Sequence, residues 1–194
     1  MKKFVFVFSA VLLMACGSKV PNKNIQDNIN VDQDTTKKTK TEVIDDTRPS
    51  PLKKTTGYIG SVKTIIQWGS PSVKGREIWG MIVPYDEVWR TGANEATTVE
   101  FDKDVTINGK DLKAGKYGFF TIPKEGEWVI IFNSVWNQWG SFEYDEKKDA
   151  LRFNLQPTIV TLSETLEYVI EADGISMAWE KLKIKLVVKE KTAV

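Results

Sequence analysis

The chain has 194 residues, of which 41% are hydrophobic and 27% charged, and its formal net charge is +1. This composition suits one globular core, and a near-neutral chain without a long basic run gives no electrostatic case for nucleic-acid binding. The sequence has no histidine and a single cysteine. Histidine- or cysteine-based triads, zinc sites and iron–sulfur clusters are therefore excluded from a single chain, and we assign no catalytic residue, metal site or cofactor.

Residues 1–15 have the pattern of an export signal. Lys2-Lys3 precedes an apolar run from Phe4 to Met14, which is shorter than the roughly 20 residues needed to span a bilayer. Leu13 to Cys16 resembles the lipobox of bacterial lipoproteins, in which cleavage leaves the cysteine as the lipid-bearing first residue. We therefore expect attachment to a membrane through lipidated Cys16, with an ordinary signal peptide or an uncleaved anchor as the alternatives.

Residues 16–49 differ in composition from the rest of the chain. After Gly17 they are rich in Asn, Asp, Gln, Thr and Lys and contain no aromatic residue, so they lack the apolar surface needed to form a core. We predict a disordered, flexible linker that tethers a domain spanning 50–194. Gly17-Ser18-Lys19 carries no acidic residue after the cysteine. This favours a location in the cell envelope, at the outer membrane facing the periplasm.

The part of the chain after residue 50 shows strand-like alternation separated by turn residues. We expect strands over 58–68, 97–101, 105–107, 110–112, 117–122, 127–132, 150–155, 166–172, 175–180 and 182–188, with 75–83 either a short strand or an extended turn.

Two turn signals and one apolar run refine this prediction. Asn108-Gly109 is the strongest hairpin signal, because this pair supplies the positive φ of a tight turn, and Asp173-Gly174 is the second. Residues 127–132 are almost continuously apolar, which is typical of a central strand buried on both faces. No helical spacing of apolar residues is sustained. The fold class we predict is therefore all-β, a single antiparallel β-sandwich of about ten short strands.

Several short motifs resemble one protein family. They are Gly75-Arg76, Gly80, Pro84-Tyr85, the run Val88-Trp89-Arg90-Thr91-Gly92-Ala93-Asn94-Glu95-Ala96-Thr97, Leu112, Ala114-Gly115-Lys116-Tyr117 and Ile122-Pro123. Together they resemble the DUF2911 family over about residues 50 to 188. The resemblance implies an exported envelope domain without an assigned biochemical function, and it supplies no catalytic residue.

The run 88–98 gathers the densest set of hydrogen-bonding groups in the chain. We predict ligand binding by Arg90, Thr91, Asn94 and Glu95. The guanidinium would grip a carboxylate, phosphate or sugar oxygen in a two-pronged way, and Asn94 and Glu95 would complete the set of donors and acceptors. In the alternative interpretation Arg90 pairs with Glu95 or with loop carbonyls, Asn94 caps a turn, and the run only joins the two sheets.

Three tryptophans bear on the same site. Trp89 alternates with Arg90, so we expect Trp89 in the core and Arg90 facing a site or another layer. Trp136 and Trp139 enclose two amide residues in a predicted loop. This pattern suits stacking on a sugar or a peptide, and we include both residues in the predicted ligand-binding set. The alternative is that they close one end of the sandwich.

These features favour a non-enzymatic envelope module that binds a small polar ligand or glycan, or a protein partner. A carbohydrate hydrolase is one alternative, in which Glu95 acts with Glu77, Glu100 or Glu143 as the second carboxylate. A purely structural or assembly domain is another, and an exposed apolar patch or a free sheet edge would distinguish it.

Overall fold

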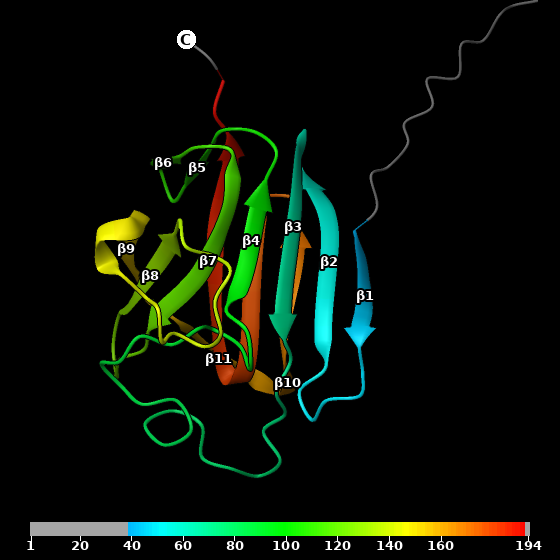
Figure 1. Ribbon diagram of the computed structural model, residues 1–194, viewed down its shortest axis with the longest axis vertical. Coiled ribbons are helices and arrows are strands. Elements are labelled where there is room, and N and C mark those ends of the chain that lie inside the picture. The colour runs from blue at the N-terminus through cyan, green and yellow to red at the C-terminus, as the bar shows by residue number, and fades with distance from the viewer. Residues whose placement is uncertain (1–38, 193–194) are drawn as a thin grey trace, which may run out of the picture. The chain divides into compact units, whose positions relative to one another are not determined.

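Two antiparallel β-sheets make up residues 39–192, the part of the chain that the computed structural model describes (Figure 1). Their strands are β1 (Lys40–Asp45), β2 (Leu52–Ile59), β3 (Val62–Gly69), β4 (Thr97–Phe101), β5 (Val105–Ile107), β6 (Lys110–Leu112), β7 (Gly115–Ile122), β8 (Trp128–Asn133), β9 (Asp149–Leu155), β10 (Thr158–Glu171) and β11 (Gly174–Glu190). Within 39–192 the one helical element is the short 3-10 helix η1 (Glu146–Lys148). In the same range no helix has the length and apolar character to cross a membrane. The predicted signal, Cys16 and the linker up to residue 38 lie outside the described residues.

The two sheets face each other. One has the strand order β1-β2-β3-β4-β7-β8-β9, the other β10-β11-β5-β6, and every pairing is antiparallel. In Figure 1, β10 and β11 lie behind β2, β3 and β4. The prediction of an all-β sandwich is confirmed.

Alternating apolar side chains explain why the sheets pack together. On β3 the side chains of Val62, Thr64, Ile66 and Trp68 are at most 1% exposed, while those that alternate with them, Lys63, Ile65 and Gln67, are intermediate or exposed. On β11, Ile184 and Leu186 are buried in the same core. Because a strand turns successive side chains to opposite faces, each sheet presents one apolar face, and burying the two against each other stabilises the sandwich.

The strand β8 is buried on both faces, as its apolar run predicts. Ile130 belongs to the core between the sheets, whereas Ile131 lies in a second cluster with Ala96 and Phe120 on the outer face of the seven-stranded sheet. Tyr144, from the connection after β8, packs on that cluster. The strand is second from the edge, however, and not central. Burial on its outer face comes from connecting segments, which the sequence pattern does not distinguish from a second layer.

The strand expected over 166–172 begins earlier, at Thr158, as β10, and two further expected boundaries are wrong. Residues 58–68 are not one strand but parts of β2 and β3, which pair as a hairpin across Gly60-Ser61, with Gly60 at φ 60°. Residues 175–180 and 182–188 form the single strand β11, in which Glu180 has φ 54°. At residues 58–68 the apolar alternation continues through the turn and so conceals it. In β11 the positive φ of Glu180 interrupts the alternation but does not end the strand.

The boundary predicted at residue 50 is also displaced, because residues 40–45 are not linker. They form β1, an edge strand whose register with β2 begins at Lys40↔Thr56. Thr41, Val43 and Ile44 are β-branched residues, which favour a strand, but the polar composition of the surrounding segment masks that signal.

The hairpin at Asn108-Gly109 is confirmed. β5 and β6 pair directly across it, and both turn residues have positive φ, 48° and 80°. The Asp173-Gly174 signal also marks a hairpin, which joins β10 to β11 and closes at the pair Glu171↔Gly174. Residues 75–83 adopt the extended-turn alternative, with one isolated bridge between Trp79 and Val83.

The end of β3 fixes the long connection to β4 by close backbone packing. Gly69 accepts a hydrogen bond from the backbone N–H of Ala93 at 3.2 Å. A Cβ atom at Gly69 would lie 2.1 Å from the carbonyl oxygen of Ala93. Only a glycine permits this approach, so the position of the segment around Ala93 depends on Gly69, at the end of β3.

We predict that Gly69→Ala destabilises the domain by about 2 to 3 kcal/mol, because the backbone at Ala93 must move to admit the methyl group. For a domain of this size this corresponds to a fall in Tm of roughly 5 to 10 °C, measurable by thermal unfolding. Gly126→Ala is the matched control, since a Cβ there meets nothing within 4 Å, and it should change Tm by at most about 2 °C. Equal Tm values for the two variants would contradict the close packing.

Candidate functional site

The predicted site residues lie in and beside the connection between β3 and β4. This connection runs along the outer end of the seven-stranded sheet, at the bottom of the view in Figure 1. The backbone of Trp89 exchanges two hydrogen bonds with Thr121, of 2.8 and 2.9 Å, and so continues the pairing of β4 along β7. The connection is therefore attached to the sheet at several points.

Thr91 is part of the packed interior. It is 0% exposed, and its hydroxyl donates to the carbonyl oxygen of Trp89 at 3.2 Å. Its own carbonyl oxygen accepts hydrogen bonds from Tyr168 at 2.8 Å and from Thr97 at 3.0 Å. The side chain of Thr91 therefore offers no exposed surface to a ligand, and it holds the connection in place.

Trp89 is in the core, as predicted. Its indole is 7% exposed and stacks on Trp179, with ring centroids 5.8 Å apart and an angle of 21° between the planes. It meets Trp79 edge to face at 5.7 Å. Its ring N–H donates to the carbonyl oxygen of Gly92 at 3.2 Å. This aromatic cluster gives the following residue, Arg90, a rigid support.

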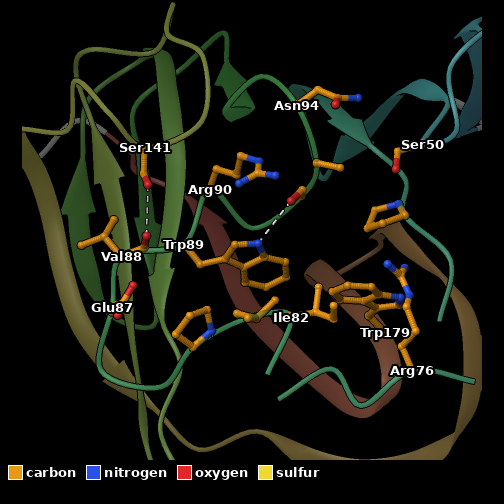
Figure 2. A pocket seen from close by; sticks show the side chains of 15 residues that line it. Ser50, Arg76, Ile82, Glu87, Val88, Trp89, Arg90, Asn94, Ser141 and Trp179 are labelled. Atoms are coloured by element: carbon orange, nitrogen blue, oxygen red, sulfur yellow. Dashed lines mark hydrogen bonds between the residues drawn. The ribbon is translucent and has the colours of Figure 1, made fainter. Parts of the chain in front are cut away.

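Arg90 extends into a cavity of about 400 Å³, which we call the Arg90 pocket. Its polar lining comes from Ser50, Arg76, Glu87, Arg90, Asn94 and Ser141, and the indoles of Trp89 and Trp179 form part of its wall. Figure 2 shows Arg90 and Arg76 on opposite sides of the Trp89 indole, with Asn94 and Ser50 above it. Two guanidinium groups and one carboxylate therefore line this space.

The side chain of Arg90 has no ion-pair or hydrogen-bond partner among residues 39–192. It is half-buried, and its Nε is buried without a hydrogen-bond acceptor. Burial lowers the pKa of the guanidinium from its ordinary value, but an arginine starts above about 12 and stays charged at neutral pH. A cation that is partly removed from water and not neutralised raises the free energy of the folded protein.

Glu95 does not pair with Arg90. Its Oε1 accepts a hydrogen bond from Nη1 of Arg48 at 2.7 Å, and the Nε of Arg48 lies 3.1 Å from Asp45. Hydrogen bonds from the side chain and backbone of Thr47, with the charge of Arg48, lower the pKa of Asp45. The alternative interpretation of an internal Arg90–Glu95 clamp is therefore wrong, since Arg48 takes the carboxylate.

A second cavity, of about 300 Å³, lies next to Glu95, and we call it the Trp136 pocket. Its lining consists of Ala96, the indoles of Trp136 and Trp139, and the polar side chains of Gln67, Glu95, Thr98, Lys116, Asn137, Gln138 and Glu143. The indoles are 38% and 58% exposed, so they do not close the end of the sandwich. Of the three carboxylates considered as partners of Glu95, only Glu143 lines this pocket.

A short backbone ribbon separates the two pockets. The N–H of Ala96 donates to the carbonyl oxygen of Gln138 at 3.0 Å, and the N–H of Gly140 donates to that of Asn94 at 2.9 Å. These bonds flank the bridge between Glu95 and Trp139. The predicted ligand set is thus divided. Arg90 and Asn94 line one pocket, whereas Glu95, Trp136 and Trp139 line the other.

Comparison with known families identifies the fold family of the chain. A family model described as "Protein of unknown function (DUF2911)" matches residues 50–188. The chain belongs to the DUF2911 family. No curated protein and no solved structure matches it. The sequence resemblance is thereby confirmed.

Outside the central run, most of the residues that carry the DUF2911 resemblance serve backbone geometry, core packing or hydrogen bonds within the domain. Gly80 has φ 85°, and a Cβ there would lie 3.0 Å from the ring of Tyr85. Leu112 is 3% exposed in the core. The hydroxyl of Tyr117 donates to the carbonyl oxygen of Lys113 at 2.9 Å. They support the fold of the domain, and in the central run Arg90 and Asn94 are the residues whose polar side chains line the Arg90 pocket.

Several residues at the two pockets are absent from the predicted set, among them Arg76, Lys116 and Gln138 in the linings and Arg48, which pairs with Glu95 from outside them. Arg76 belongs to a family motif, and its guanidinium donates to the carbonyl oxygens of Val73 and Ser72. Arg48 lies in the presumed linker, Lys116 on β7, and Gln138 between the two loop tryptophans. The amides between the tryptophans were visible in the sequence, but nothing in the sequence indicates that Arg48 or Lys116 approaches the site.

A double-mutant cycle tests the pairing of Glu95. We predict a coupling of about 1 kcal/mol between Arg48→Gln and Glu95→Gln, because the two side chains are 22% and 39% exposed and form a partly screened ion pair. The cycle of Arg90→Gln with Glu95→Gln should give a coupling close to zero. Denaturant unfolding of the single and double variants measures both energies. If the coupling of Arg90 with Glu95 were the larger of the two, Arg90 and not Arg48 would be the ion-pair partner of Glu95.

Proposed function

We propose that this DUF2911 domain is a non-enzymatic binding module, and that the Arg90 pocket captures a small molecule bearing an oxyanion, either a carboxylate or a phosphate. The observation that carries the proposal is the half-buried guanidinium of Arg90, which has no anionic partner among residues 39–192 and faces a cavity of about 400 Å³. A bound oxyanion would supply the missing acceptors and would neutralise the charge. This neutralisation contributes to the free energy of binding, because the free-energy cost of burying the cation is incurred when the protein folds.

The other polar groups of the pocket suit the same ligand class. Arg76 adds a second positive charge, and Glu87 is the single carboxylate of the lining, so the pocket carries a net positive charge. Asn94 and Ser50 add neutral donors, and Asn94 makes no side-chain hydrogen bond within the described part of the chain. A volume of this size matches small-molecule sites in proteins.

Binding accounts for these residues better than the two alternatives. A carbohydrate hydrolase would use Glu95 and Glu143, which line the Trp136 pocket, but one oxygen of Glu95 is already engaged by Arg48. A purely structural domain gives no reason to leave a charged side chain half-buried and unpaired, since an apolar residue of similar size would fill the position at lower free energy.

We predict that Arg90→Met weakens oxyanion binding at least tenfold while leaving stability unchanged or raising it by up to about 1 kcal/mol, because the variant removes an unpaired, partly desolvated charge. Calorimetric titration with inorganic phosphate, succinate and glycerol 3-phosphate measures binding, and thermal unfolding measures stability.

Arg152→Met is the matched control. Arg152 lies outside the Arg90 pocket and pairs with Glu146 and Asp149, each at 3.2 Å. Its loss should lower stability by about 1 kcal/mol and leave anion binding unchanged. Failure of all three anions to bind the wild-type domain would overturn the proposal. A fall of several degrees in the Tm of the Arg90 variant would assign Arg90 a structural role.

We further propose that the domain is held at the periplasmic side of the outer membrane by a lipid on Cys16. Its support is the signal-like segment before Cys16 and the lack of acidic residues just after it. Cys16→Ser should therefore move the full-length protein from the membrane fraction to the soluble periplasmic fraction, as followed by immunoblotting of fractionated cells. Continued membrane association of the variant would argue against the lipid anchor.

A further inference from the structure

The Trp136 pocket carries an inference that is independent of the anion proposal. We propose that it binds a neutral saccharide, with the indole of Trp139 as the stacking surface and with Gln138 and Glu95 as acceptors for ligand hydroxyl groups. The pocket lies on the other side of the Asn94–Ala96 ribbon from the Arg90 pocket, and the two linings share no residue.

Gln138 is the strongest sign that this pocket is built to hold a ligand. The residue is buried, with only 6% of its surface exposed. The amide Nε2 donates to the carbonyl oxygen of Val135 at 2.9 Å, which fixes the orientation of the amide. The opposite atom, Oε1, is buried and has no donor. A buried acceptor without a partner costs free energy, which a ligand hydroxyl group would recover.

Glu95 adds a second acceptor to the same pocket. Its Oε1 is held by Arg48, and its Oε2 is buried without a hydrogen-bond partner. The pair formed with Arg48 also fixes the direction of the carboxylate. Two acceptors that are held in place by their own partners form a preorganised set, which loses little entropy when a ligand binds.

The aromatic groups supply the apolar part of the recognition. Trp139 is 58% exposed, and within residues 39–192 it makes no aromatic or cation–π contact. Trp136 is 38% exposed, and the ammonium of Lys116 lies over its ring at 4.1 Å. The indole of Trp139 is therefore free to cover the C–H face of a sugar ring, whereas the Lys116 contact holds Trp136 at the side of the pocket.

The charges at the pocket disfavour an anionic ligand. The lining holds the carboxylates of Glu95 and Glu143 and one ammonium, that of Lys116, and the guanidinium of Arg48, which pairs with Glu95 from outside the lining, also contacts Asp45. The amides of Gln67 and Asn137 provide further donors and acceptors. A pocket with two carboxylates, several amides and an open indole suits a polyhydroxylated ring better than an anion.

The test uses the whole mature domain and four neutral probes: maltotetraose, cellotetraose, xylotetraose and tetra-N-acetylchitotetraose. Tryptophan fluorescence and calorimetric titration should detect binding of at least one of them. Trp139→Ala should then raise its Kd about tenfold or more, and Gln138→Met should also raise it. The Trp139 side chain is exposed, so its variant should unfold at the wild-type Tm.

Phe142→Ala is the matched control, because Phe142 is an 87% exposed aromatic residue in the same connection that does not line the pocket. It should leave the Kd unchanged, as should Arg90→Met, so failure of the anion proposal does not affect this result. The inference is overturned if none of the four saccharides binds, if Trp139→Ala binds like the wild type, or if a tetra-alanine peptide binds where the saccharides do not.

Discussion

The carbonyl oxygen of Thr91 joins three parts of the molecule at one point. It accepts a hydrogen bond from Tyr168 on β10 and another from Thr97 on β4, so the connection that carries Thr91 is bonded to both sheets. Burial raises the pKa of Tyr168 well above its ordinary value, which keeps the phenol protonated and able to donate. Two donors on one buried acceptor leave this segment little freedom, because breaking either bond strands a buried polar group.

Both candidate pockets depend on that fixed point. On one side of Thr91, Arg90 extends over the aromatic cluster into its own cavity. On the other, the chain pairs with the loop that carries Trp139, so Glu95 and Asn94 face different cavities although they are neighbours in sequence. Thr91 and Asn94 both have positive φ, 51° and 65°. These left-handed residues turn the chain within a few positions and distribute a compact run of polar side chains over two sites.

This geometry explains what the sequence could predict. Regular alternation predicts the strand structure of residues 62–68, and the Asn108-Gly109 pair predicts a hairpin with the correct partners, because both signals act over a few residues. The predicted ligand set grouped residues by their distance along the chain, and that distance is a poor guide in a segment with two left-handed residues. A positive φ at a β-branched threonine is an exception to residue preference, so it cannot be read from the sequence.

Arg48 is a second residue whose place at the site cannot be predicted from the sequence. Its contact with Glu95 determines which charged groups of the site remain unpaired. Glu95 is the carboxylate of the central run, and without a competing cation it would be the natural partner of Arg90. The corner that follows β1 brings Arg48 to Glu95, with Asp45 as its second contact. Because the carboxylate of Glu95 is engaged there, Arg90 keeps its charge unmatched in one pocket, and the other oxygen of Glu95 remains without a donor beside the second. A residue that composition assigns to a linker thus determines that this motif has two open polar faces and not one internal ion pair.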